Sequence, residues 1–363
     1  MPRTALPSAL VLAAALAAGG CAAPVEPLDV TAEAGTDSPL PDRYGHTAVW
    51  TGELALLWGG GAFGDAAPGP QGAAYDPDTD TWTPLPDSPL DGTRRRHAAA
   101  WTGTELIVWG GMPDTEGPHY PADGARYDPG TGEWTPLAPA PSGRWNAVAA
   151  ADREHLVVGG GQTAHGTATG IMVHDAAADT WSVVPTGTPV VDLALLPGGE
   201  AVVLLADAEE TVLAAFDPDT GGAVATAHTW PGSGTHGLAV HDGTVHVTVG
   251  DGETVAVDTF DTDLEHRDTR ELAADSFLPA RAAHFAGDGA PGAGVTDDGV
   301  LVAVSPQGVS VLDTGTGRTG FAQSPRLVGH CAEGSSVVAG ERVLLFGCGD
   351  HVGIVRPGGV SDR

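Results

Sequence analysis

Lysine is absent from the sequence. All 16 basic residues are arginines against 47 acidic residues, so the formal net charge is −31 at pH 7. A surface of that sign repels the phosphates of nucleic acids and anionic lipid headgroups, which argues against nucleic-acid binding. Only 17% of the residues are charged, whereas 53 are glycine and 29 are proline. Because glycine and proline cost a helix interior about 1 and 3 kcal/mol each, the composition favours short strands joined by turns.

Cysteine is scarce, with three residues in the chain. Residues 1–20 combine one positive charge with an apolar run of about 14 residues, which predicts a signal peptide rather than a transmembrane helix of roughly 20 residues. The run closes on Leu-Ala-Ala-Gly-Gly-Cys, which resembles the lipobox of bacterial lipoproteins. This resemblance implies a lipid on Cys21, a polar tether after it, and a place on the outer face of the bacterial cell membrane. Residues 21–40 are thus expected to hold the lipidated N-terminus and the tether, together with a closing strand that is inferred below from the repeats. The alternative is ordinary secretion.

The other two cysteines, Cys331 and Cys348, flank two apolar runs separated by Ala-Gly-Glu-Arg. That pattern predicts a hairpin whose outer ends can meet. An exported chain can oxidise such a pair, so we expect a disulfide between them. A metal site would need more ligands at close spacing.

A duplicated unit dominates the sequence from Arg43 onward. Landmarks recur at 51 or 52 residues: His46 and His97, Trp50 and Trp101, Gly59 and Gly110, Trp82 and Trp134. Such a fixed offset is the signature of a repeated supersecondary unit. Within each unit we expect four short strands: a small-residue run, an apolar run closing on Gly-Gly, a run ending in Tyr-Asp-Pro, and a run starting at Trp.

The pattern resembles the kelch repeat, with its Gly-Gly after the second strand, Tyr before the third turn and Trp in the fourth strand. The matching positions are Gly59-Gly60, Tyr75 and Trp82; Gly110-Gly111, Tyr127 and Trp134; and Gly159-Gly160 and Trp181, with His174 near the Tyr place. This resemblance implies an all-β, kelch-type β-propeller over residues 41–363, with four-stranded blades around a central channel. No metal or other cofactor is predicted.

Blade number follows from counting the later, weaker units. Beyond Trp181 the strand rhythm continues without the diagnostic residues and brings the count to seven, while six or eight blades remain open. The last unit lacks a fourth strand. We expect residues near 28–34 to complete it, because closing the ring removes an exposed sheet edge.

Arginine and histidine gather where each unit enters its first strand, which in kelch propellers faces the channel mouth. The predicted ligand-binding residues are Arg43, Arg94, Arg144, Arg281, Arg326, His46 and His97, with Arg95 and Arg96 at the same kind of position. Arginine suits bidentate binding of carboxylate, sulfate or phosphate. The alternative is that each Arg pairs with an Asp of a neighbouring turn. Histidine recurs at one position of the units, and Asn146 and Asp192 take that position in two of them. These histidines could bind a metal, or they could bond backbone carbonyls.

Other features are assigned to structure. Asp76 to Asp80 lacks the Gly and Glu of a calcium loop and is interpreted as a turn. The repeat tryptophans are expected in the core between blades, whereas Trp145 and Trp230 fall outside the repeat positions and are candidate loop aromatics for a sugar.

Function is predicted from the leader, the repeats and the arginines together. The expectation is a monomeric, membrane-tethered, non-catalytic module that binds an envelope or extracellular protein, peptide or glycan at the channel mouth. The alternative is an extracytoplasmic carbohydrate-active enzyme of lyase, epimerase or sialic-acid-processing type using the same pocket. A third hypothesis is a purely structural propeller that binds no ligand. Galactose-oxidase-like copper chemistry is disfavoured, because Gly45 and Arg96 stand where that resemblance requires Tyr.

Overall fold

The computed structural model of the chain describes residues 27–41, 43–62, 71–113, 120–222, 225–232, 235–250, 254–273, 293–305, 308–323, 334–347 and 351–358. The predictions made for Cys21, Arg281, Arg326, Cys331 and Cys348 lie outside these residues. Over the described ranges, no helix is long and apolar enough to cross a membrane.

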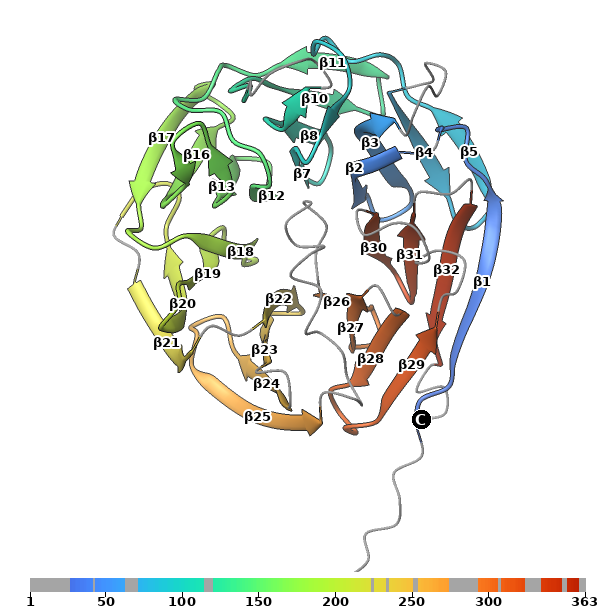
Figure 1. Ribbon diagram of the computed structural model, residues 1–363, viewed down its shortest axis with the longest axis vertical. Coiled ribbons are helices and arrows are strands. Elements are labelled where there is room, and N and C mark those ends of the chain that lie inside the picture. The colour runs from blue at the N-terminus through green and yellow to red at the C-terminus, as the bar shows by residue number, and fades with distance from the viewer. Residues whose placement is uncertain are drawn as a thin grey trace, which may run out of the picture.

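Seven four-stranded antiparallel sheets are arranged in a ring as the blades of a β-propeller (Figure 1). Blade 1 contains β2 (Arg43–Trp50), β3 (Ala55–Ala62), β4 (Gly72–Asp76) and β5 (Thr81–Pro84). Blade 2 contains β7 (Ala98–Trp101), β8 (Leu106–Trp109), β10 (Gly124–Asp128) and β11 (Glu133–Pro136). Blade 3 contains β12 (Val148–Ala151), β13 (His155–Gly159), β16 (Gly170–Asp175) and β17 (Thr180–Pro185). Blade 4 contains β18 (Val190–Leu195), β19 (Ala201–Ala206), β20 (Glu210–Phe216) and β21 (Ala225–Pro231).

The remaining blades keep this order from the channel outward. Blade 5 contains β22 (Thr235–His241), β23 (Thr244–Gly250), β24 (Thr254–Phe260) and β25 (His266–Ala273). Blade 6 contains β26 (Ala293–Val295), β27 (Val300–Ser305), β28 (Gly308–Asp313) and β29 (Thr319–Gln323). Blade 7 contains β30 (Ser335–Ala339), β31 (Arg342–Phe346), β32 (His351–Pro357) and β1 (Val30–Asp37). Two short ribbons pair β6 (Arg94–Arg95) with β9 (Met112–Pro113), and β14 (Gln162–Thr163) with β15 (Gly166–Thr167). The predicted seven-bladed architecture is confirmed.

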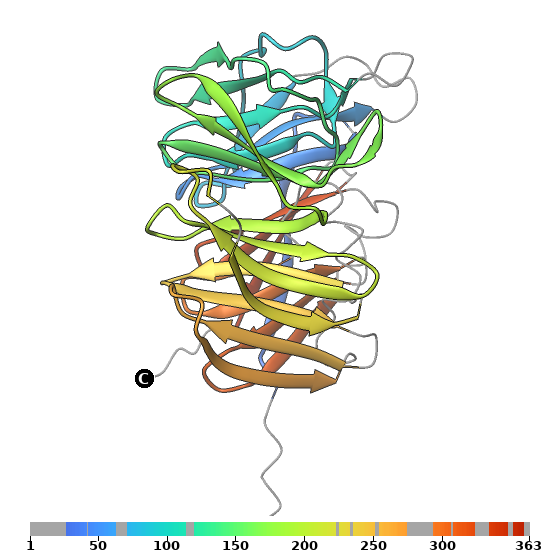
Figure 2. The ribbon, with the colours of Figure 1, turned by 90° about the vertical axis from the view of Figure 1, so that its left-hand side faces the viewer.

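The N-terminal strand closes the ring as predicted. β1 pairs antiparallel with β32, from Val30 opposite Pro357 to Ala34 opposite Gly353. It lies on the outer rim of blade 7 beside β32, and its C-terminal end reaches blade 1, where the Thr36 amide donates to Asp80 Oδ1 (Figure 1). Seen from the side, the strands run between the two faces of the disc (Figure 2), so loops gather at both faces. The strand entries and the Gly-Gly ends of the second strands lie on the same face, because neighbouring strands are antiparallel.

Glycine at the end of the second strand has a steric cause. Gly59 has φ +75°, and a Cβ there would lie 2.5 Å from the Arg94 carbonyl oxygen of the next blade. Gly110 repeats this with φ +69° and a distance of 2.6 Å to the Arg144 carbonyl oxygen. A side chain would therefore push neighbouring blades apart, and the left-handed backbone favours glycine independently.

Aromatic side chains fill the space between blades. Trp58 and Trp109 are each 1% exposed. The fourth-strand tryptophans lie over the Tyr or His of the third strand, with centroid separations of 4.8 Å for Tyr75–Trp82, 5.1 Å for Tyr127–Trp134 and 5.0 Å for His174–Trp181. His174 thus takes the Tyr place.

One tryptophan differs from expectation. Trp230 is not a loop aromatic: it belongs to β21, is 9% exposed, and donates from Nε1 to Asp258 Oδ2 at 2.6 Å. The indole ring of Trp230 packs in the interface between blades 4 and 5. The two repeat units that form these blades contain no other tryptophan. The Asp76 segment is a turn as predicted, with Asp76 Oδ1 accepting from the amides of Asp78 and Thr79.

Candidate functional site

Three of the predicted arginines bond inside the protein. Arg43, Arg94 and Arg144 are 7%, 3% and 5% exposed. In each, Nη1 donates to the carbonyl oxygen of the glycine 16 residues later, at 2.7, 3.4 and 3.0 Å for Gly59, Gly110 and Gly160. The guanidinium groups therefore give these backbone carbonyls a hydrogen-bond donor inside the protein.

Each of these arginines makes further hydrogen bonds. Arg94 also makes a two-pronged ion pair with Asp123, at 2.9 Å for both bonds, which confirms the alternative of an Asp partner at this position. Arg43 and Arg144 bond further backbone carbonyls, of Gln71 and Gly170. Burial lowers the pKa of Arg43 and of Arg144 to about 10, so both stay protonated at neutral pH. Their predicted role in ligand binding stays a prediction.

Histidine at the strand entry also lies inside. His46 and His97 are 2% and 1% exposed. His97 Nδ1 lies 3.2 Å from the Arg94 carbonyl oxygen, its Nε2 bonds Thr47 Oγ1 of blade 1 at 2.6 Å, and its ring meets Trp58 edge-on. His236 bonds Thr211 in the same way between blades 4 and 5. These rings therefore join neighbouring blades, and the backbone-carbonyl reading is confirmed for His97.

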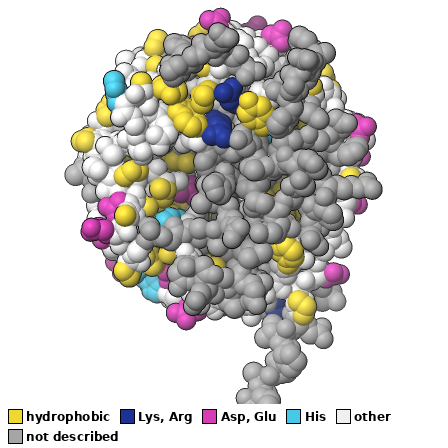
Figure 3. Space-filling model, viewed as in Figure 1, with side chains coloured by type: hydrophobic (Ala, Val, Ile, Leu, Met, Phe, Trp, Pro, Cys, Tyr) yellow, Lys and Arg dark blue, Asp and Glu magenta, His cyan; other side chains and the backbone are white. Residues whose placement is uncertain are grey.

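A second layer of side chains lies above the buried arginines. The Arg95 guanidinium carbon lies 5.6 Å from the centroid of the Tyr44 ring, and that of Arg96 lies 5.4 Å from the Trp145 ring. All four side chains are half-buried. Figure 3 shows arginine gathered near the mouth over the start of blade 2, flanked by hydrophobic side chains, while acidic groups spread along the periphery. The mouth thus carries two cation–π pairs in an acidic protein.

The backbone beneath these pairs adopts a conformation that is uncommon for residues other than glycine. Gly45, Arg96 and Asn146 occupy corresponding positions in three blades and have φ of 64°, 54° and 52°. The Arg96 amide donates to Gly45 O at 2.7 Å and the Asn146 amide to Arg96 O at 2.9 Å. Left-handed backbone held by such contacts is enriched at functional sites. The prediction that placed Asn146 at the histidine position is wrong. The structure puts Asn146 one residue earlier, equivalent to Gly45 and Arg96, because its amide bonds to Arg96 O as the Arg96 amide bonds to Gly45 O.

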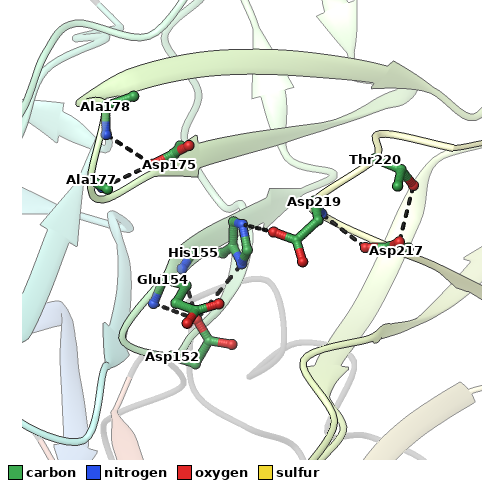
Figure 4. Close-up of polar contacts among 9 residues, drawn as sticks. All are labelled: Asp152, Glu154, His155, Asp175, Ala177, Ala178, Asp217, Asp219 and Thr220. Carbon is green, nitrogen blue, oxygen red and sulfur yellow. Dashed lines mark hydrogen bonds and ion pairs between the residues drawn. The ribbon is translucent and has the colours of Figure 1, made fainter.

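Among the described residues, a group with metal-ligand character lies on the opposite face. One ligand atom each from Glu154, His155 and Asp219 lie within 4.8 Å of one another. His155 Nε2 lies 3.1 Å from Asp219 Oδ1, and the imidazole stands between Asp219 and Asp152 (Figure 4). Asp152 in turn accepts amide bonds from its own turn. This cluster joins the blade 3 turn to a turn of blade 4, which accounts for its geometry without a bound ion.

Comparison with known proteins supports the repeat assignment. Residues 45–192 match the model of the KLHDC2/KLHL20/DRC7 Kelch-repeats domain, so this part of the chain carries kelch repeats. The chain is 34% identical over 156 residues to the Kelch-like protein terF of Aspergillus terreus (strain NIH 2624 / FGSC A1156). That match covers 37% of this chain and 34% of the relative, so the chain spans about a third of the relative's length.

A solved structure shares the fold. It is a fungal alcohol oxidase with catalytic diversity among the AA5 family, in complex with copper. It superposes with a TM-score of 0.63 at 16% identity, over 90% of this chain and 76% of that one. At this identity the likeness shows the propeller fold alone.

Proposed function

We propose that this chain is an extracytoplasmic propeller, tethered through a lipid on Cys21, that binds a protein or peptide partner at the channel mouth. The observation that carries the proposal is the pair of stacked arginines, Arg95 on Tyr44 and Arg96 on Trp145. Aromatic rings and arginine are the side chains that most often dominate protein interfaces. Kelch propellers generally bind proteins, and the kelch match covers Arg95, Arg96 and Trp145.

The stacked geometry favours an acidic partner segment. A guanidinium that lies on a ring uses its face, whereas it binds a carboxylate through its edge, so one side chain can do both. Stacking also orders the side chain before the partner arrives, which lowers the entropy cost of binding. Because the rest of the protein is strongly acidic, this basic mouth is where an acidic segment meets least repulsion.

Replacing both stacked arginines tests the mouth. A partner crosslinked in intact cells is purified and titrated against the wild type and the Arg95→Ala/Arg96→Ala variant. We expect the double variant to bind at least about tenfold more weakly, since it loses the guanidinium–carboxylate hydrogen bonds to the partner, each worth about 1.5 kcal/mol or more.

The matched control removes two arginines elsewhere. Arg153 and Arg267 are exposed and lie away from the mouth, so Arg153→Ala/Arg267→Ala makes the same charge change and should keep wild-type affinity. Equal affinity of the mouth variant and the control would contradict the proposed site. Binding that only a glycan screen detects would favour the glycan reading, and turnover of that glycan would favour the enzyme.

The tether is tested separately. Cys21→Ser removes the thiol that the lipid would occupy, so the protein should move from the membrane fraction into the culture medium. Measurement is by immunoblot of fractionated cells, with incorporation of labelled fatty acid as a second readout. Retention of the variant in the membrane with unchanged labelling would exclude lipidation at this residue.

A further inference from the structure

The central channel forms a cavity of about 450 Å³ bounded by the innermost strands of all seven blades. Its described lining residues are alanine, valine and leucine with Trp50, one glycine and one ionisable residue, Asp192. The small side chains of the inner strands, such as Ala99 and Ala150, leave this space open. The free edges of these strands add backbone hydrogen-bonding groups but no charge.

Asp192 is an unusual residue for such a lining. Its Oδ1 accepts from the Leu193 amide and its Oδ2 from the Leu238 amide, both at 2.9 Å. A carboxylate has about four lone-pair sites, so two bonds leave acceptor capacity on both oxygens. Burial raises the pKa of Asp192 to about 7, and no charged side chain of the described residues acts to lower it.

A purely structural role explains this residue incompletely. Asp192 does join blade 4 to blade 5 through the Leu238 amide. However, an interblade link needs only a neutral acceptor, as the Thr47–His97 contact shows between blades 1 and 2. A carboxylate beside apolar side chains is destabilised by lost hydration unless a cation approaches it. With no such cation among the described residues, the missing partner points to a ligand.

We propose that the channel binds an elongated apolar molecule that ends in a protonated amine, with Asp192 holding the amine and the inner strands holding the apolar part. The chain's net charge of −31 attracts cations toward the channel and disfavours an anionic head. This site is distinct from the arginine pairs at the mouth, which would repel an amine.

Three probes of equal chain length test the proposal: dodecylamine, dodecanol and dodecanoate, each titrated into the full chain by calorimetry and by fluorescence of the tryptophans, which include Trp50. We expect dodecylamine to bind at one site and at least tenfold more tightly than dodecanoate. Asp192→Asn should remove that preference while leaving dodecanol binding unchanged. Ala194→Trp, which fills the channel, should abolish binding of all three.

The matched control is Asp207→Asn. Asp207 also accepts two amide bonds, from Glu209 and Glu210, but lies at an exposed turn outside the channel, so its variant should bind dodecylamine like the wild type. Arg95→Ala/Arg96→Ala should do the same, which separates this site from the mouth. Equal binding of amine and carboxylate by the wild type, or unchanged binding by Ala194→Trp, would overturn the proposal. These two results do not depend on Asp192→Asn folding.

Discussion

Trp109→Ala is expected to lower the free energy of unfolding by about 3–5 kcal/mol, the usual cost of emptying a fully buried tryptophan site. Trp109 is 1% exposed, and its ring lies 5.6 Å from that of Trp181 across the interface between blades 2 and 3. Its Nε1 donates to the Ala122 carbonyl oxygen at 3.0 Å. The substitution therefore opens a cavity and removes one of the two donors to that carbonyl oxygen, which still accepts from the Ala140 amide at 2.8 Å.

Denaturant unfolding monitored by circular dichroism measures this effect. Phe321→Ala is the control, because Phe321 is 44% exposed and its loss should cost less than about 1 kcal/mol. Trp109→Phe keeps a ring and loses the hydrogen bond, so it should fall between the two. If Trp109→Ala and Phe321→Ala were equally destabilising, the packing between blades 2 and 3 would contribute far less than its burial indicates.

Blades 1 to 3 were predictable because their diagnostic residues have geometric roles. Gly59 is required where the next blade approaches, and Tyr75 and Trp82 stack on each other. His174 could be placed at the Tyr position because an imidazole fills the same space against Trp181.

For blades 4 to 7, the sequence predicted only that strands and turns alternate at regular spacing. Their interfaces are filled by valine, leucine and phenylalanine, as at Phe216 and Phe260, which are 2% and 0% exposed. Such residues mark a buried strand but no particular position in a repeat. Trp230 was misplaced for this reason, since its role depends on Asp258, a partner 28 residues away that no local pattern indicates.

The sequence predicted where the arginines of the mouth lie, but not which of them are buried and which stack on aromatic rings nearer the surface. Arg94 and Arg95 are neighbours in the sequence, yet Arg94 is buried on Gly110 and Asp123 while Arg95 lies over Tyr44. Alternation along a short strand sends adjacent side chains to opposite sides. The register of β6 with β9 decides which of the two arginines points toward the mouth. A strand of two residues has no hydrophobic alternation from which that register could be predicted.

Acid sensitivity gives the second large effect. Burial, assisted by the charge of Arg94, lowers the pKa of His97 to about 3, whereas the same imidazole in the unfolded chain titrates near 6.5. Between these values the unfolded state binds the extra proton, so stability is lost as the pH falls below about 6.5. At pH 4 the loss from this residue amounts to about 3 kcal/mol. His46, with its pKa lowered to about 3, acts in the same direction.

His97→Gln should therefore lose about 3 kcal/mol less stability than the wild type between pH 7 and pH 4, measured by denaturant unfolding at several pH values. Asp192 changes the free energy of unfolding in the opposite direction between pH 7 and pH 4, because its raised pKa favours the folded state at low pH. Both proteins contain Asp192, so its contribution cancels when their pH profiles are subtracted. Thr47→Val is the control: it removes the hydroxyl bonded to His97 and leaves the imidazole. It should be less stable at every pH while keeping the acid dependence. Parallel profiles for His97→Gln and the wild type would show that His97 is not held neutral between the blades.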